Sequence, residues 1–173
     1  MKKIIFFLLT CSVTCLNAQQ TPPKSPCLTN PIYRQFDFWI GEWEAFAPDG
    51  KKGGDSKIEL ILDSCVILEN WTSAGSYNYS GKSFNTFNTA TGKWQQTWID
   101  NAGGITYYSE GGFNDGKMIL DTKNEKQPDG TYKILRMTFS KLSSDKVRQF
   151  GESSNDNGVT WKTDFDLEYR RKK

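Results

Sequence analysis

The sequence contains no histidine. Histidine is the usual general base near neutral pH, a common zinc ligand and the commonest axial ligand of haem iron. Its absence excludes a Ser-His-Asp or Cys-His hydrolase and any histidine-ligated centre. A zinc site would need carboxylates and thiols alone, and the sequence has no such cluster. We therefore expect no metal and no cofactor.

The sequence also has little excess of basic residues, with 22 lysines and arginines and 20 acidic residues. Lys2 and Lys3 fall within a predicted signal peptide, so the processed chain has a net charge near zero. This balance argues against nucleic acid or an anionic membrane as a partner. The basic residues 170–173 are interpreted as a solvated tail.

No apolar run is long enough to span a bilayer. Lys2 and Lys3 precede an apolar run at 4–9, and Ala18 ends a small-residue exit. This pattern predicts a secretory signal peptide over 1–18, with a membrane anchor as the alternative. A proline-rich linker at 19–31 and one domain at 32–173 follow. We expect an exported protein, periplasmic or secreted, without stable membrane insertion after cleavage.

Cysteine is scarce, and only Cys27 and Cys65 remain after processing. Two cysteines in an exported protein most simply form a disulfide, with two buried free thiols as the alternative. A bridge between them would contribute about 3–4 kcal/mol by restricting the unfolded chain.

The sequence shows no pattern of an amphipathic helix of ten residues. It consists instead of short segments in which apolar and polar residues alternate, separated by turn residues. Turns are expected at Gly53-Gly54, 114–116, 128–130 and 156–158. Strands are expected at 42–46, 57–62, 65–71, 83–87, 94–99, 105–113, 118–122, 132–141, 146–152 and 159–170. This spacing predicts an all-β fold, a single antiparallel meander barrel of about 8–10 strands. A two-sheet sandwich is the alternative.

The segment from Phe36 to Glu44 is rich in aromatic residues and marks the start of the barrel. Asn30 and Pro31 can begin a short helical turn that runs to about Phe38. Its apolar face predicts a plug across one open end of the barrel.

Gly41-Glu42-Trp43, after this turn, resembles the G-x-W signature of lipocalins. The resemblance implies that Trp43 packs under the barrel floor, with a basic residue from the chain's end, Arg170 or Arg171, lying across it.

A closer resemblance is to secreted bacterial lipocalin-like (calycin-type) proteins of unknown function. It lies in the Phe-Asp-Phe-Trp-Ile-Gly-Glu-Trp opening, in Cys65 followed by Glu69-Asn70-Trp71, and in Trp-Gln-Gln-Thr-Trp at 94–98. A terminal pattern of Trp161, Asp166, Tyr169 and Arg170 also belongs to it. This implies a lipocalin-like barrel without an assigned activity. Nitrobindin-like barrels are similar more distantly, but they bind haem through a histidine that this chain lacks.

Two local motifs are interpreted as structural. Residues 154–161 fit the Asp-box pattern S-x-D-x-G-x-T-W of sialidases, and a single copy predicts a turn stabilised by Asp156, Gly158 and Trp161. Glu42 and Glu44 share a strand face as paired glycosidase carboxylates might, but a solvated face is the preferred interpretation.

Polar residues alternate with aromatic residues on several strand faces. If these faces line the lumen, they form an apolar cavity with a few polar anchors, the usual form of a ligand site. Arg136 would then pair with Glu69 or with a ligand carboxylate. A register shifted by one residue, or a buried network without a ligand, is the alternative. The predicted ligand-binding residues are Glu69, Trp71, Ser83, Asn85, Gln96, Trp98, Tyr107 and Arg136.

Three functions follow from this pattern. The first is a barrel that binds a small apolar or amphipathic molecule. The second is an enzyme, an isomerase or carbohydrate-active hydrolase, that uses Glu69 and Tyr107. The third is a solidly packed envelope interaction protein without a ligand.

Overall fold

The computed structural model describes residues 25–76 and 78–173. The predicted signal peptide at 1–18 lies outside the described residues, as does the linker before Ser25. None of the helices in the described chain is long and apolar enough to cross a lipid bilayer.

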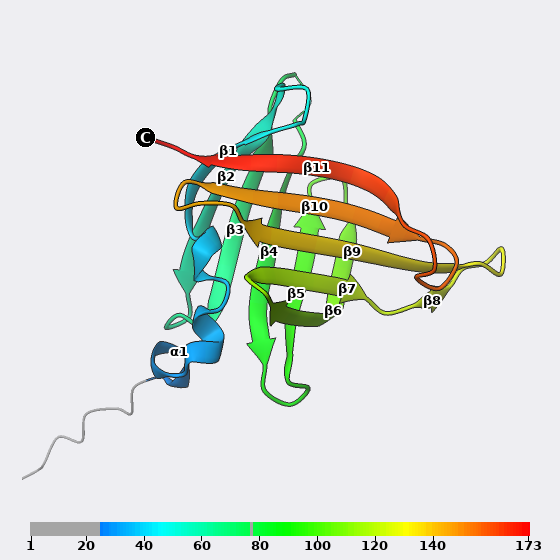
Figure 1. Ribbon diagram of the computed structural model, residues 1–173, viewed down its shortest axis with the longest axis horizontal. Helices are drawn as coiled ribbons and strands as arrows, with labels where there is room; N and C mark the ends of the chain where they lie inside the picture. The colour runs from blue at the N-terminus through cyan, green and yellow to red at the C-terminus, as the bar shows by residue number, and fades with distance from the viewer. Residues whose placement is uncertain (1–24, 77) are drawn as a thin grey trace, which may run out of the picture.

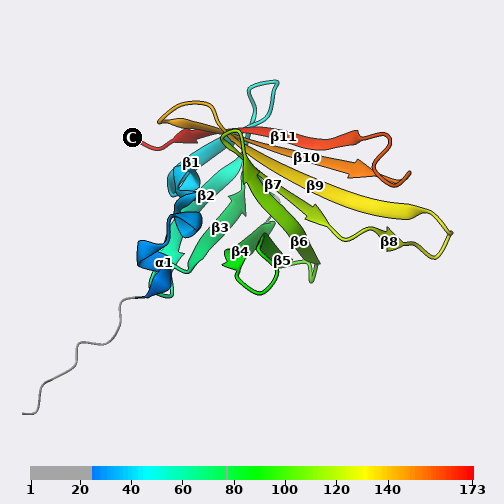
Figure 2. The ribbon, with the colours of Figure 1, turned by 60° about the horizontal axis from the view of Figure 1, so that its bottom comes forward.

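The fold is a closed antiparallel meander barrel of ten strands. Each barrel strand pairs with the next barrel strand along the chain, with β7 pairing directly with β9, and β11 returns to pair with β1, so that the last strand lies beside the first (Figures 1 and 2). Closure gives each of the ten barrel strands a hydrogen-bonded neighbour on both sides. The bounds are β1 (Gly41–Phe46), β2 (Lys52–Ile61), β3 (Val66–Ser73), β4 (Ser80–Asn88), β5 (Lys93–Asp100), β6 (Ile105–Asn114), β7 (Lys117–Thr122), β8 (Glu125–Lys126), β9 (Tyr132–Lys141), β10 (Lys146–Ser154) and β11 (Lys162–Arg171).

All ten expected strand regions are present, with differences at β8, at the start of β2 and at the start of β11. Short β8 pairs with β9 in a hairpin that projects from the barrel (right in Figure 1). The expected loop at Gly53 and Gly54 is wrong, because both residues lie inside β2. A β-carbon at Gly54 would stand 2.6 Å from the Trp71 ring. The glycine therefore serves close packing of a tryptophan rather than a turn.

Three short helical turns close one end of the barrel: α1 (Pro26–Thr29), η1 (Pro31–Arg34) and η2 (Asp37–Trp39). The expected turn from Asn30 to about Phe38 corresponds to η1 and η2, whereas α1 lies in the segment expected as a linker. The Asn30 side chain caps η1 by accepting a hydrogen bond from the Ile32 amide at 3.1 Å. Phe36 and Trp39 are fully buried and stack with ring centroids 5.1 Å apart. They contact Phe139 of β9, so the plug forms part of the core.

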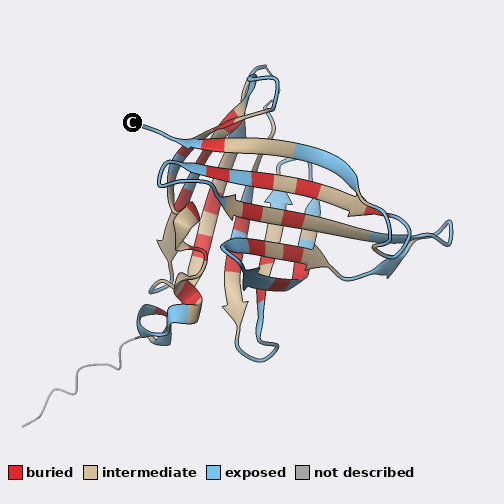
Figure 3. Cartoon of the chain, in the orientation of Figure 1, coloured by how far each residue is buried: buried red, intermediate tan, exposed pale blue. Residues whose placement is uncertain are grey.

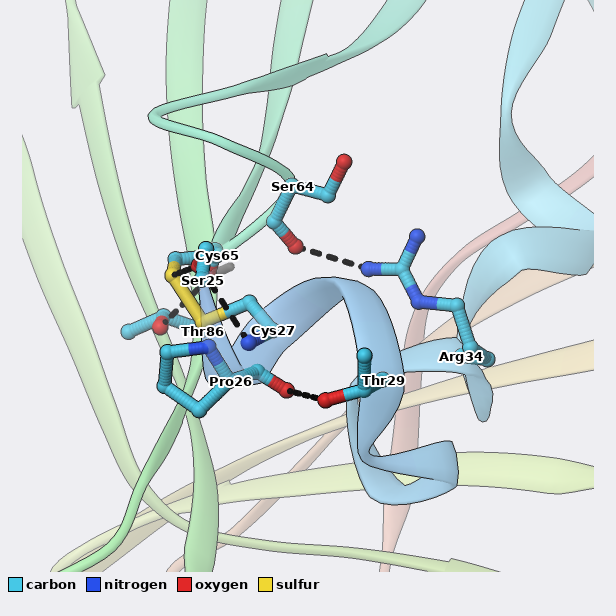
Figure 4. The surroundings of a disulfide bond; sticks show 8 residues. All are labelled: Ser25, Pro26, Cys27, Thr29, Arg34, Ser64, Cys65 and Thr86. Atoms are coloured by element: carbon cyan, nitrogen blue, oxygen red, sulfur yellow. Dashed lines mark hydrogen bonds between the residues drawn. A yellow bond between two sulfur atoms is a disulfide. The ribbon is translucent and has the colours of Figure 1, made fainter. Parts of the chain in front are cut away.

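The disulfide between Cys27 and Cys65 joins the plug to the turn before β3, with the two Cα atoms 4.9 Å apart (Figure 4). Beside it, Arg34 Nη2 donates a hydrogen bond to the Ser64 carbonyl oxygen at 2.7 Å. The predicted pairing of the two cysteines is confirmed, and α1 and η1 are held against the barrel by covalent and polar contacts.

The floor residue Trp43 is fully buried, and its indole donates to the Trp39 carbonyl oxygen at 2.8 Å. The Arg171 guanidinium lies 4.2 Å from the Trp43 ring centroid, whereas Arg170 lies over Phe46 on the outside. Of the two expected candidates, Arg171 covers the floor. Gly41 has a φ of 137°, and a side chain there would collide with the Arg171 guanidinium.

The Asp-box segment forms a turn between β10 and β11. Asp156 accepts hydrogen bonds from the Thr160 amide and hydroxyl at 2.8 and 2.6 Å, and these bonds lower the pKa of Asp156 to about 2. Gly158 has a φ of 83°, and the Trp161 indole donates to its carbonyl oxygen. Because this turn occupies residues up to Trp161, β11 begins at Lys162 rather than at 159.

Candidate functional site

A cavity of about 360 Å³ occupies the barrel on the side away from the plug. Strand β5 shows where the cavity lies relative to the plug. Trp94, at one end of the strand, contacts Phe36 of the plug, and Trp98, at the other end, lines the cavity and contacts Tyr79. Burial falls in the same direction, because Glu69 and Tyr169 are buried whereas Trp98 is half-buried. Buried bands alternate along the strands around the lumen (Figure 3). The lining residues are Glu69, Trp71, Ser73, Tyr79, Gln96, Trp98, Thr106, Tyr108, Met137, Gln149, Phe165, Leu167 and Tyr169.

Glu69 is the acid at the buried end, with 2% of its surface exposed. Ser56 Oγ of β2 donates to Glu69 Oε1 at 2.9 Å, and Ser83 Oγ of β4 donates to Oε2 at 3.0 Å. Tyr169 Oη of β11 lies 3.4 Å from Oε1 and donates to Gln149 Oε1 at 2.5 Å. Three hydroxyl groups from three strands therefore surround one carboxyl group.

Amide side chains extend this network along the wall. Gln96 donates to Asn85 Oδ1 at 2.7 Å, and Asn85 Nδ2 donates to Ser83 Oγ and to the Ile67 carbonyl oxygen, both at 3.0 Å. The register places Ser83 directly opposite Glu69 and Gln96 directly opposite Asn85. The chain of donors from Gln96 through Asn85 and Ser83 ends on the Glu69 carboxyl group, which orients the acid firmly.

Glu69 has no cationic partner, since neither lysine nor arginine is among the lining residues that the structure describes. Burial raises the pKa of Glu69 to about 7, although the hydroxyl contacts act in the opposite direction. Near neutral pH this carboxyl group is therefore present in both forms. Burial also raises the pKa of Tyr169 well above its ordinary value and that of Tyr108 to about 12, so both phenols keep their protons.

Aromatic rings form the more open end of the cavity. Trp71 and Trp98 each lie against a glycine, Gly54 and Gly81, where a side chain would collide with the ring. The Trp98 indole donates to Tyr79 Oη at 3.3 Å, and Tyr79 in turn contacts Asp100. The glycines let the rings lie flat against the wall and leave the space in front of them open.

Six of the eight predicted ligand-binding residues lie at this site. Four line the cavity, namely Glu69, Trp71, Gln96 and Trp98. Ser83 and Asn85 are fully buried behind them in the hydrogen-bond network. The inward faces expected for β3, β4 and β5 are therefore present.

The expected inward position of Tyr107 is wrong. Its side chain is 50% exposed, and the neighbouring Tyr108 lines the cavity instead. Strand β6 carries an extra residue relative to both neighbours, so that Tyr108 and Ser109 are buried in succession. This bulge changes which face each residue presents, and strict alternation misses it.

The expected inward position of Arg136 is also wrong. Its guanidinium makes a two-pronged ion pair with Asp121, both contacts being 2.8 Å, and lies 4.2 Å over the Trp161 ring. Both sets of alternate residues in β9 contain apolar side chains, and the more apolar set, with Met137 and Phe139, faces inward. Arg136 therefore links the Asp-box turn to β7 and β9, and it takes no part in the hydrogen-bond network around Glu69.

Sequence reasoning missed Ser56, Gln149 and Tyr169 as parts of the site. Tyr169 belongs to the terminal pattern of the family resemblance, which is the one signal that singled it out, but nothing in the sequence relates it to Glu69, 100 residues away. Among the described residues, no group of three or more acidic or cysteine side chains is placed to hold a metal.

No protein-family model matches the chain, and no curated protein matches it either. The fold and the site define a class: a closed ten-stranded barrel, compatible with a lipocalin-like fold, with a cavity that ends on a buried carboxyl group.

Proposed function

We propose that the protein is an exported lipocalin-like barrel that binds a small apolar or amphipathic molecule in its lumen. The observation that carries this proposal is the cavity itself, whose aromatic walls lead to a buried carboxyl group held in a hydrogen-bond network. Its volume of about 360 Å³ lies near the lower end of the range for small-molecule sites, roughly 300–1,000 Å³. A cavity of this size argues against a solidly packed barrel. The predicted signal peptide and the disulfide support export.

Adjacent residues of β6 offer a matched test of binding. Thr106 lines the cavity, whereas Tyr107 points outward. Thr106→Trp fills the cavity and should abolish binding of amphipathic probes, measured by quenching of tryptophan fluorescence and by calorimetry. Tyr107→Trp should bind them as the wild type does. Equal binding by both variants, or no binding of any probe by the wild type, would contradict the proposal.

A second candidate is an acid–base enzyme on the same site, favoured by the Glu69 pKa of about 7 and by the nearby phenol of Tyr169. Tyr169 replaces Tyr107 in this role. Glu69 is the one carboxyl group among the lining residues described, and a glycosidase ordinarily needs two, so an isomerase fits better. Deuterium exchange into carbonyl compounds, lost in Glu69→Gln, would support catalysis. Bound molecules recovered without exchange would argue for binding alone.

A further inference from the structure

The charged side chain that lines the cavity is an acid, and this limits the charge that a ligand can carry. Glu69 is a lining carboxyl group, and the other titratable groups that share the cavity are the phenols of Tyr79, Tyr108 and Tyr169. The neighbouring strands β2 and β4 contact the Glu69 carboxyl group through the uncharged hydroxyls of Ser56 and Ser83. The part of the lining that the structure describes therefore contains no positive charge.

A ligand carboxylate has no partner here. The arginine expected for that role, Arg136, is already paired through both prongs with Asp121 and lies against Trp161. An anionic head group moved to the buried end would lose its hydration and face another carboxyl group, which is unfavourable on both counts. The cavity therefore disfavours fatty acids and similar anions.

A cationic head group, in contrast, would be attracted by the ionised Glu69 carboxylate. An ionised carboxylate has about four acceptor sites, and Glu69 uses two of them for the hydroxyls of Ser56 and Ser83. The Tyr169 hydroxyl lies 3.4 Å from Glu69 Oε1 but donates its proton to Gln149. Acceptor capacity therefore remains for a donor from the cavity. The faces of aromatic rings attract cations, and Trp71, Trp98 and Tyr79 stand between the open end and the acid.

From this geometry we propose that the ligand is a cationic amphiphile, an amine whose ammonium group pairs with Glu69 while its apolar part lies between Trp71 and Trp98. The proposal rests on the ligand-binding function above. The ammonium supplies the positive charge that the site lacks, and a short apolar tail fits the volume and the aromatic walls.

Binding of such an amine depends on pH in a definite direction. The pKa of Glu69 is about 7 in the empty protein, so ionising it becomes less costly as the pH rises toward 7. Affinity for an amine should increase about tenfold per pH unit below 7 and level off above it, until the amine itself loses its proton near pH 10. A neutral alcohol binds without requiring this ionisation and should not gain affinity over the same range.

The test compares three probes with one tail, octylamine, 1-octanol and octanoate, by calorimetry between pH 5 and pH 8.5. We expect octylamine to bind most tightly at pH 8, by about tenfold or more over octanol, and octanoate most weakly. If octanol binds and octylamine binds no better, the inference fails while the ligand-binding function stands. If none of the three binds, the ligand-binding function fails, and the inference fails with it.

Two variants separate the role of Glu69 from general charge effects. Glu69→Gln keeps the size of the side chain and should bind octylamine and octanol equally, without the rise in affinity between pH 5 and pH 7. Binding of octanol by this variant shows that its cavity is intact. Glu42→Gln removes an exposed charge on β1 and should behave as the wild type does. Retained amine preference in Glu69→Gln, or its loss in Glu42→Gln, would overturn the proposal.

Discussion

At the residue scale, Glu69 is almost fully buried, and no lysine or arginine is among the described residues that line its cavity. Most buried acids are paired with a cation, and an unpaired one weakens the fold when it ionises. Three hydroxyl contacts reduce this cost, but burial is the larger influence, since the pKa of Glu69 still rises from 4.5 to about 7. A residue that lowers stability at neutral pH is typical of a functional position.

The pH dependence of stability follows from this shift. Because the folded state holds the Glu69 proton more tightly than the unfolded state, stability should fall as the pH rises from about 4.5 to about 7. The loss should approach roughly 3 kcal/mol, since one pKa unit corresponds to about 1.4 kcal/mol. Denaturant unfolding at pH 5 and pH 8 measures it, and Glu69→Gln should lack this contribution.

Glu42→Gln is the matched control, because Glu42 is exposed on β1. The difference between wild type and Glu69→Gln should change with pH, whereas the difference between wild type and Glu42→Gln should stay nearly constant. A pH-independent difference for Glu69→Gln would show that the acid is ionised at both pH values, contrary to its raised pKa.

At the element scale, the strands were predictable because glycine, asparagine and aspartate mark most of the turns between them. The inward faces of β3, β4 and β5 were also predictable, since their alternation is unbroken and buried Ile67 and Trp94 set the parity. The faces of β6 and β9 were not. A bulge displaces Tyr108 into the lumen, and both faces of β9 carry apolar residues, so local pattern alone does not decide the register.

Glycines within strands set the shape of the cavity wall. A β-carbon at Gly81 would collide with the Trp98 ring and stand 2.8 Å from the Ile99 carbonyl oxygen. Gly81→Ala should therefore displace Trp98, lower stability by about 1–3 kcal/mol and alter the cavity. Thermal unfolding and the Trp98 environment, monitored by fluorescence, measure both effects.

Gly112 offers a control within β6, because nothing lies within 4 Å of the position of its β-carbon. Gly112→Ala should be neutral or slightly stabilising, since alanine restricts the unfolded chain more than glycine does. If Gly81→Ala were as stable as Gly112→Ala, the close packing of Trp98 on β4 would not matter for the wall.

At the scale of the whole molecule, one end of the barrel is closed by structural contacts and the other end leads into the cavity. The plug, the disulfide and the Trp43 floor close one end, and the aromatic walls lead into the cavity from the other. The sequence pointed to the plug through its capping residues and its aromatic run. It gave no sign that Tyr169 meets Glu69, because that contact depends on how β11 closes the barrel against β1.

This separation predicts that the disulfide stabilises the barrel without shaping the cavity. Replacing both Cys27 and Cys65 by serine removes a link across a separation of 38 residues and should cost about 3–4 kcal/mol, measured by denaturant unfolding. Probe affinity under conditions where the variant is fully folded should match that of the wild type, because neither cysteine lines the cavity. Weakened binding in the folded variant would mean instead that the plug controls the shape of the lumen from the opposite end. Such coupling would have to pass through the aromatic core formed by Phe36, Trp39 and Phe139, the contacts that join the plug to the strands.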